Sequence, residues 1–170
     1  MTFKFKIVAG FGAGLAILIL VGVLSYESLI RTAEDRAWVT HTHLALEKVD
    51  AVLADLLDAE TGQRGYILTG DPSYLAPYTD ALSHVHQNVK ELRELTADNP
   101  VQQHSLDRLE KLIAARLAGL QDRIAVRSRE GLAAGAEGVR QGRGKENMDQ
   151  IRALIAEMGM EENRLLKLRS

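Results

Sequence analysis

The chain opens with a continuous apolar segment and goes on with apolar residues spaced as in amphipathic helices. Residues 7–24 are apolar or glycine and carry no charge, a length at the short end of a membrane-spanning helix. Two lysines precede this segment and acidic residues follow it, and basic residues close to a span favour its cytoplasmic side. We therefore expect residues 1–6 in the cytoplasm, a transmembrane helix over 7–26, and residues 27–170 outside the membrane.

A cleaved signal peptide is the alternative interpretation of the apolar segment. Signal peptides have shorter apolar cores, which are followed by small residues at a cleavage site. Here the core is long, and the Val-Leu-Ser-Tyr sequence at 23–26 is a poor cleavage context. These features favour an uncleaved anchor, in which Tyr26 is placed to lie at the membrane interface.

Beyond the anchor, apolar residues recur at alternating steps of three and four, the pattern of helices that bury one face. Four such helices are predicted. Their apolar positions are Leu46, Val49, Leu53 and Leu56; Tyr78, Leu82, Val85, Val89 and Leu92; Leu106, Leu109, Ile113, Leu117, Leu120 and Ile124; and Met148, Ile151, Ile155 and Met158. In the third helix, two consecutive steps of four indicate a local departure from a strict heptad.

Prolines and glycines mark the expected helix ends. The first helix is predicted to run from the membrane to Thr69 and to stop at Gly70. Asp71 and Pro72 are suited to begin a short turn before the second helix. The Asp-Asn-Pro segment at 98–100 is expected to end the second helix and to cap the third.

A glycine-rich connection over residues 131–144 leads to the fourth helix. Short connections place consecutive helices antiparallel. The predicted fold is therefore all-α: an up-down-up-down antiparallel four-helix bundle whose first helix is continuous with the transmembrane helix. The apolar pattern of the fourth helix still runs close to Ser170, so we expect a second membrane span and an output domain beyond that residue.

Composition narrows the possible functions. The net charge is −2, whereas a nucleic-acid-binding domain normally carries a basic stripe, so no nucleic acid partner is expected. The chain has no cysteine, which excludes disulfides and thiolate metal sites. The histidines of the pairs 41/43 and 84/86 are two residues apart, which places them on different helix faces, so no metal site is expected. The chain shows no catalytic elbow, phosphate-binding glycine loop or kinase motif, and we expect neither catalysis nor a cofactor.

The apolar seam of the first helix is interrupted by polar residues. Continuing its spacing places Glu60 and Gln63 where a bundle core usually has leucine, and Arg64 follows Glu60 by one helical turn. Gly62 and Gly65 flank them, although a glycine within a helix costs about 1 kcal/mol relative to alanine. Two interpretations stay open: a polar layer that binds a small ligand or switches between two packings, and a structural layer that sets the helix register.

Four further side chains are candidates for the same ligand-binding or switch region. Tyr66 and Tyr74 flank the turn between the first two helices, where they either line a pocket or pack over the turn. Arg127 extends the seam of the third helix, and Arg152 lies beside the seam of the fourth. Either arginine is placed to neutralise a core carboxylate such as Glu60; the alternative for both is a solvated guanidinium on the surface.

Several of these segments carry a family resemblance. Residues 58–78, which include Asp-Ala-Glu-Thr-Gly-Gln-Arg-Gly-Tyr and Asp-Pro-Ser-Tyr-Leu, resemble the signature of the third type of CHASE domain. The name stands for cyclases/histidine kinases associated sensory extracellular. Weaker matches occur in the expected order at 38–42, 97–103 and 148–152, so that the resemblance spans nearly everything outside the N-terminal apolar segment.

This resemblance implies an all-helical input module outside the membrane, usually followed by a second span and a histidine kinase, diguanylate cyclase or chemoreceptor region. We expect an extracytoplasmic sensory domain of a bacterial receptor in the cell membrane, which passes an unknown small-molecule or protein stimulus onward by helix repacking. The resemblance also implies a homodimer. The alternative function is a membrane-anchored helical module that binds a partner or dimerises and senses no small molecule.

Overall fold

The structure, a computed structural model, describes residues 3–140 and 142–169, and every regular element in those ranges is helical. The all-α class predicted from the apolar spacing is therefore confirmed. The elements are α1 (Phe3–Thr69), the 3₁₀ helix η1 (Pro72–Leu75), α2 (Ala76–Leu95), α3 (Pro100–Glu130), α4 (Leu132–Arg140) and α5 (Arg143–Arg169).

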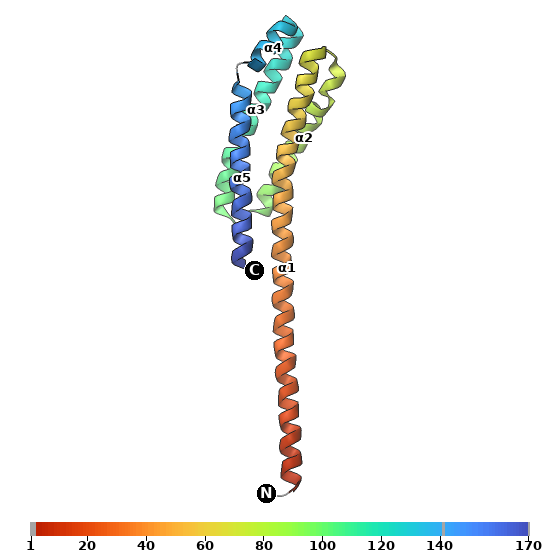
Figure 1. The fold of residues 1–170 in the computed structure, drawn as a ribbon, viewed down its shortest axis with the longest axis vertical. Helices are drawn as coiled ribbons and strands as arrows, with labels where there is room; N and C mark the ends of the chain where they lie inside the picture. Colours follow the sequence, from red (N-terminus) through yellow and green to blue (C-terminus); the bar gives the residue numbers. More distant parts are fainter. Residues whose placement is uncertain (1–2, 141, 170) are drawn as a thin grey trace.

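The long helices lie side by side and alternate in direction. Figure 1 shows α2 returning beside the C-terminal half of α1, α3 running outward again, and α5 returning after the short α4. α1 packs against α2, α3 and α5. Its N-terminal half extends beyond the other helices, whereas α4 lies at the opposite end of the molecule (Figure 1). One continuous helix thus connects the α4 end of the molecule with the N-terminal end.

None of the helices has both the length and the mean hydropathy needed to cross a membrane, as judged from the residues whose placement is described. The transmembrane helix expected over residues 7–26 includes side chains that lie outside the described ones. It stays a prediction.

The core is an apolar stripe shared by the long helices. On α1 the fully buried residues include Ala45, Val52 and Ala59, whereas Leu46 and Leu53 are only partly buried. The core positions predicted at Leu46 and Leu53 are therefore wrong by one residue, because the preceding residues, Ala45 and Val52, are the buried ones. Small residues allow a neighbouring helix to approach closely, and the larger leucines then pack at the edge of that contact.

The helix ends are fixed by local hydrogen bonds. Gly70 ends α1 with φ +77, in the left-handed region that favours glycine. Asp71 caps η1 by accepting from the Ser73 N–H at 2.9 Å. Asn99 caps α3 by accepting from the N–H groups of Val101 and Gln102 at 3.0 and 3.2 Å. These caps lie where the polar residues before each proline predict them.

The glycine-rich connection differs from expectation in one respect. Residues 132–140 form the helix α4 between α3 and α5, rather than an irregular link. Gly131 and Gly142 have φ +86 and +73 and form the breaks on its two sides. The left-handed conformation at Gly131 turns the chain, and α4 then packs alongside the C-terminal part of α3.

We expect the Asn99→Ala variant to lose about 1 kcal/mol of unfolding free energy, because two backbone donors at the start of α3 lose their acceptor. Urea denaturation followed by circular dichroism measures the loss. The Asn99→Ser variant keeps a side-chain acceptor at the cap without adding a charge beside Glu161, and it should stay close to the parent chain. Equal losses in both variants would show that the cap hydrogen bonds contribute little.

Acid should weaken the turn between α1 and α2. The Ser73 backbone N–H, with a further contribution from its hydroxyl, holds the pKa of the Asp71 carboxyl below its ordinary value of 3.8. A carboxyl with a lowered folded-state pKa stabilises the fold above the unfolded pKa, and this stabilisation is lost as the pH falls through the folded pKa. As the pH falls below 3.8, the unfolding free energy of Asp71→Asn should therefore decrease less than that of the parent chain. Parallel acid dependences of the two unfolding free energies would contradict this assignment.

Candidate functional site

A buried ion pair joins α1 to α3. Arg116 Nη2 lies 2.7 Å from Glu60 Oε2, and the two side chains are only 3% and 14% exposed. Arg64, one turn along α1, also pairs with Glu60, but its side chain is 60% exposed. Glu60 is half-buried, and the fully buried residue at this point of α1 is its neighbour Ala59, so the core position predicted for Glu60 is one residue off. The pair that crosses from Glu60 to α3 is nevertheless shielded from solvent. We call Glu60, Gln63 and Arg116 the polar layer.

Gln63 lies in the same layer and is 1% exposed. Its Nε2 has no hydrogen-bond partner among the described residues. A buried amide donor without a partner costs free energy that an apolar residue would avoid. At least one donor of the polar layer is therefore not paired with a protein group in this packing.

Glycine allows the turn after α1 to fold back onto the polar layer. A Cβ added at Gly62 would lie 2.7 Å from the Tyr74 carbonyl oxygen and 3.2 Å from the Tyr78 nitrogen. A Cβ at Gly65 would collide with the Tyr74 ring. The two glycines thus permit direct contact between α1 and the backbone of η1 and α2, which explains why α1 accepts their helix-destabilising effect.

The two tyrosine candidates occupy different environments. Tyr66 is buried at 9% exposure, whereas Tyr74 is 47% exposed and lies over Gly65. Tyr74 thus corresponds to the packing alternative rather than to a pocket wall. Burial raises the pKa of the neighbouring Tyr78 hydroxyl.

The two arginine candidates do not pair with Glu60. Arg127 donates from Nε to the Ile67 carbonyl at 2.7 Å and lies against Gly70, so it caps the C-terminal end of α1. A cation at this end also interacts favourably with the helix dipole. Arg152 pairs with Asp149 on its own helix at 2.9 Å, with both side chains 47% exposed. The structure thus brings Glu60 and Gln63 together in the layer and places Arg127 and Arg152 elsewhere.

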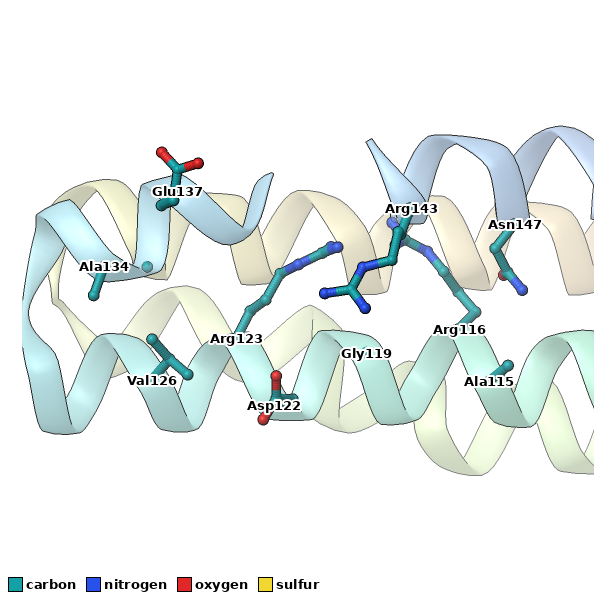
Figure 2. Close-up of a pocket in the computed structure, with 12 residues that line it drawn as sticks. Ala115, Arg116, Gly119, Asp122, Arg123, Val126, Ala134, Glu137, Arg143 and Asn147 are labelled. Carbon is teal, nitrogen blue, oxygen red and sulfur yellow. The ribbon is translucent and has the colours of Figure 1, made fainter. Parts of the chain in front are cut away.

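A cavity of about 540 Å³ lies beside the polar layer, between α3, α4 and the start of α5. Figure 2 shows three guanidinium groups at this cavity: Arg116 and Arg123 from α3 and Arg143 from α5. Burial, followed by repulsion from Arg116 and Arg143, lowers the pKa of the Arg123 guanidinium. The lowered pKa means that burial and the two neighbouring cations disfavour the charged form of Arg123 itself.

Arg116 and Arg123 are functional candidates that the apolar seam passed over. From Ile113 the seam followed Leu117, a step of four, but a strict heptad continues instead through Arg116, Leu120 and Arg123. The two consecutive steps of four in α3 were the available signal. They mark the place where charged residues take the seam positions that face Glu60 and the cavity.

A second buried polar pair lies nearer the C-terminal end of α5. The Gln102 amide donates from Nε2 to Glu162 Oε1 and to the Met158 carbonyl, both at 2.9 Å. Gln102 and Glu162 are 1% and 2% exposed. This pair joins α3 to α5, and so buried polar contacts hold α3 to α5 near its N-terminal end and to α1 near its middle.

Comparison with protein families matches residues 35–170 to the CHASE3 domain. The match covers well over half of the 170 residues. The chain belongs to the CHASE3 domain family. The matched range includes the polar layer and all residues that line the cavity between α3, α4 and α5. These features are therefore parts of the CHASE3 domain.

A solved structure is similar to this CHASE3 domain. It is the sensor domain of the histidine kinase HK9 of Rhodopseudomonas palustris, with a TM-score of 0.68 and 28% sequence identity. The similarity covers 73% of this chain and 97% of the solved chain. A search of curated proteins finds no significant match. The family and the structural relative together show that this CHASE3 domain is an extracellular sensory input module of a signalling receptor.

Proposed function

We propose that this CHASE3 domain passes its signal by shifting α1 against α3 and α5 in an up-down-up-down four-helix bundle. The observation that carries this proposal is the buried pair between Glu60 and Arg116 at 2.7 Å. Glu60 lies on α1, which is one uninterrupted helix from Phe3 to Thr69. A change in the partner of Arg116 therefore alters the seating of a helix that reaches the N-terminal end of the chain.

The second part of the proposal is a membrane anchor in the N-terminal part of α1. Exposed apolar side chains cover the described positions of this stretch; they include Leu15, Ile17, Leu18, Ile19, Leu20, Val21, Val23 and Leu24, each at least 50% exposed. Apolar surface of this extent is costly in water and favourable in lipid. With Lys4 and Lys6 on the cytoplasmic side, the sensory part lies in the periplasm of a bacterial cell.

The third part concerns the output and the assembly. The similarity to a histidine kinase sensor domain supports a histidine kinase as the output domain, and so this chain acts without catalysis of its own. Two copies related by a two-fold axis are proposed as the signalling unit. Chemical cross-linking of membranes that contain the full receptor tests this assembly: a receptor that stays monomeric in both signalling states excludes it.

The central experiment is a chimeric receptor in which this chain replaces the sensor domain and first span of a CHASE3 histidine kinase. The double variant Glu60→Leu/Arg116→Met removes both members of the ion pair, so neither is left as an unpaired buried charge. We expect autophosphorylation to change by about fivefold or more, because coupling free energies between signalling states are typically a few kcal/mol. The Arg64→Gln variant, which removes the exposed partner of Glu60, is the matched control and should leave the output near that of the parent.

Unchanged output in the double variant would reject the polar layer as a switch. If the chimera also responds to no stimulus while the chain binds another membrane protein tightly, the alternative of an interaction module is favoured. Enzyme turnover by the isolated chain would contradict both functions.

A further inference from the structure

The cavity beside the polar layer has the chemistry of an oxyanion site. Arg116 and Arg123 are seven residues apart on α3, which places them on one face two turns from each other. A Cβ added at Gly144 would lie 2.5 Å from Arg116 Nη1 and 2.9 Å from Arg123 Nη1. Two guanidinium groups from α3 therefore converge on one point at the start of α5, and glycine at 144 leaves room for that approach.

The polar atoms at this cavity are incompletely paired. Arg123 makes no hydrogen bond or ion pair with the residues that the structure describes, although it lies beside two other arginines. Arg116 is 3% exposed, and its buried Nε also lacks a partner within the described chain. Repulsion from Arg116 and Arg143 acts on Arg123 more strongly than attraction to Glu60 and Asp122. An anion that accepts hydrogen bonds from these guanidinium groups relieves the repulsion.

Two acidic residues, Asp122 and Glu137, line the cavity with the arginines, and Asp122 attracts the neighbouring Arg123. In Figure 2 the carboxylate of Glu137 points away from the three guanidinium groups. Glu60 occupies one side of Arg116 from the α1 direction. Asn147 lies on the other wall with its buried Oδ1 unpaired among the described residues, and rotation of its amide presents a donor to the cavity.

We propose that this cavity binds a small metabolite that carries a carboxylate or phosphate group, held by Arg116, Arg123 and Arg143. Planar guanidinium groups match both kinds of oxyanion with paired hydrogen bonds. The volume of about 540 Å³ lies within the range of small-molecule sites. The proposal rests on the sensory function proposed above and assigns that function a class of ligand.

The site is placed to act on the proposed switch. An anion that accepts from Arg116 competes with Glu60 for the same guanidinium, and one that bridges Arg123 to Arg143 draws the start of α5 toward α3. α5 in turn packs on α1, where a Cβ at Gly159 would lie 3.5 Å from Leu46. The anion therefore binds the two packings with different affinity, which is the requirement for a ligand to shift their populations.

Isothermal titration calorimetry on the full 170-residue chain in neutral detergent tests the proposal, with sodium succinate and inorganic phosphate titrated separately at constant ionic strength. We expect saturable binding of at least one anion with a dissociation constant below about 1 mM. Arg123→Gln should weaken binding about tenfold, since it removes a charged donor. Arg129→Gln, an exposed arginine of the same helix, is the matched control and should leave binding unchanged.

Gly144→Ala provides a second variant that acts by space rather than charge. Its methyl group displaces the tips of two flexible arginine side chains, so the fold should persist while anion binding weakens. Tighter binding of succinate identifies a carboxylate site, and tighter binding of phosphate identifies a phosphate site. Binding of neither anion at about 10 mM, or equal binding by Arg123→Gln and Arg129→Gln, overturns the proposal.

The two proposals fail separately. If no anion binds but the Glu60→Leu/Arg116→Met chimera changes its output, only the ligand class is wrong. If an anion binds through Arg123 and the chimera keeps its output, the cavity is a binding site and the polar layer is not the switch.

Discussion

Glu60→Leu alone is expected to lower the unfolding free energy of the chain by about 3 kcal/mol, because removal of one member of a buried ion pair leaves the other charge unpaired. Arg116 is 3% exposed, whereas Arg64, the other partner of Glu60, is 60% exposed. Denaturation with urea, followed by circular dichroism of the full chain in detergent, measures the difference. Arg64→Gln should cost at most about 0.5 kcal/mol, as expected for an exposed pair one turn apart.

The double variant Glu60→Leu/Arg116→Met separates the effect of the charge from that of the side-chain shape. Replacing both members of a buried pair with apolar residues of similar size is often neutral or stabilising. We therefore expect the double variant to lie within about 1 kcal/mol of the parent chain. A loss as large as that of Glu60→Leu alone would show that the ion pair itself stabilises the fold, and the layer would then be structural.

The helical fold was predictable because local signals agree with the tertiary packing. Asp71, Asn99 and Gly70 lie at the helix ends that their side chains and backbone preferences predict. These preferences act within a few residues and so can be read without knowledge of neighbouring helices. The core face of α1 was less predictable, because the choice between Val52 and Leu53 depends on how closely a neighbouring helix approaches.

The candidate site was predictable on α1 and not on α3. Glu60 and Gln63 interrupt an otherwise apolar seam, and this contrast is visible in the sequence. Arg116 stands beside Leu117, and both side chains are buried. The apolar spacing followed Leu117, and apart from the two steps of four it gave no sign that the charged neighbour is buried as well. Partner choice for a long side chain depends on which helix faces it, as the α1-capping position of Arg127 also illustrates.

Gly62→Ala is expected to destabilise the fold by about 2 kcal/mol, although alanine favours helix formation over glycine. The added Cβ would meet two backbone atoms, the Tyr74 oxygen at 2.7 Å and the Tyr78 nitrogen at 3.2 Å. Backbone atoms cannot rotate away, so α1 must separate from η1 and the start of α2, and overpacking of this kind typically costs 1–3 kcal/mol. The unfolding free energy from urea denaturation gives the size and sign of the effect.

Gly119→Ala is the matched control, since it is also a glycine within a long helix but has no atom within 4 Å of its added Cβ. There the helix preference acts alone, and we expect a gain of about 0.5–1 kcal/mol. Gly65→Ala should fall between the two, because the Cβ meets the ring of Tyr74, a half-exposed side chain that can turn aside. If the unfolding free energy falls in Gly62→Ala and rises in Gly119→Ala, close backbone approach maintains the turn beside the polar layer. A rise in Gly62→Ala would show that the turn packs more loosely than its contacts indicate.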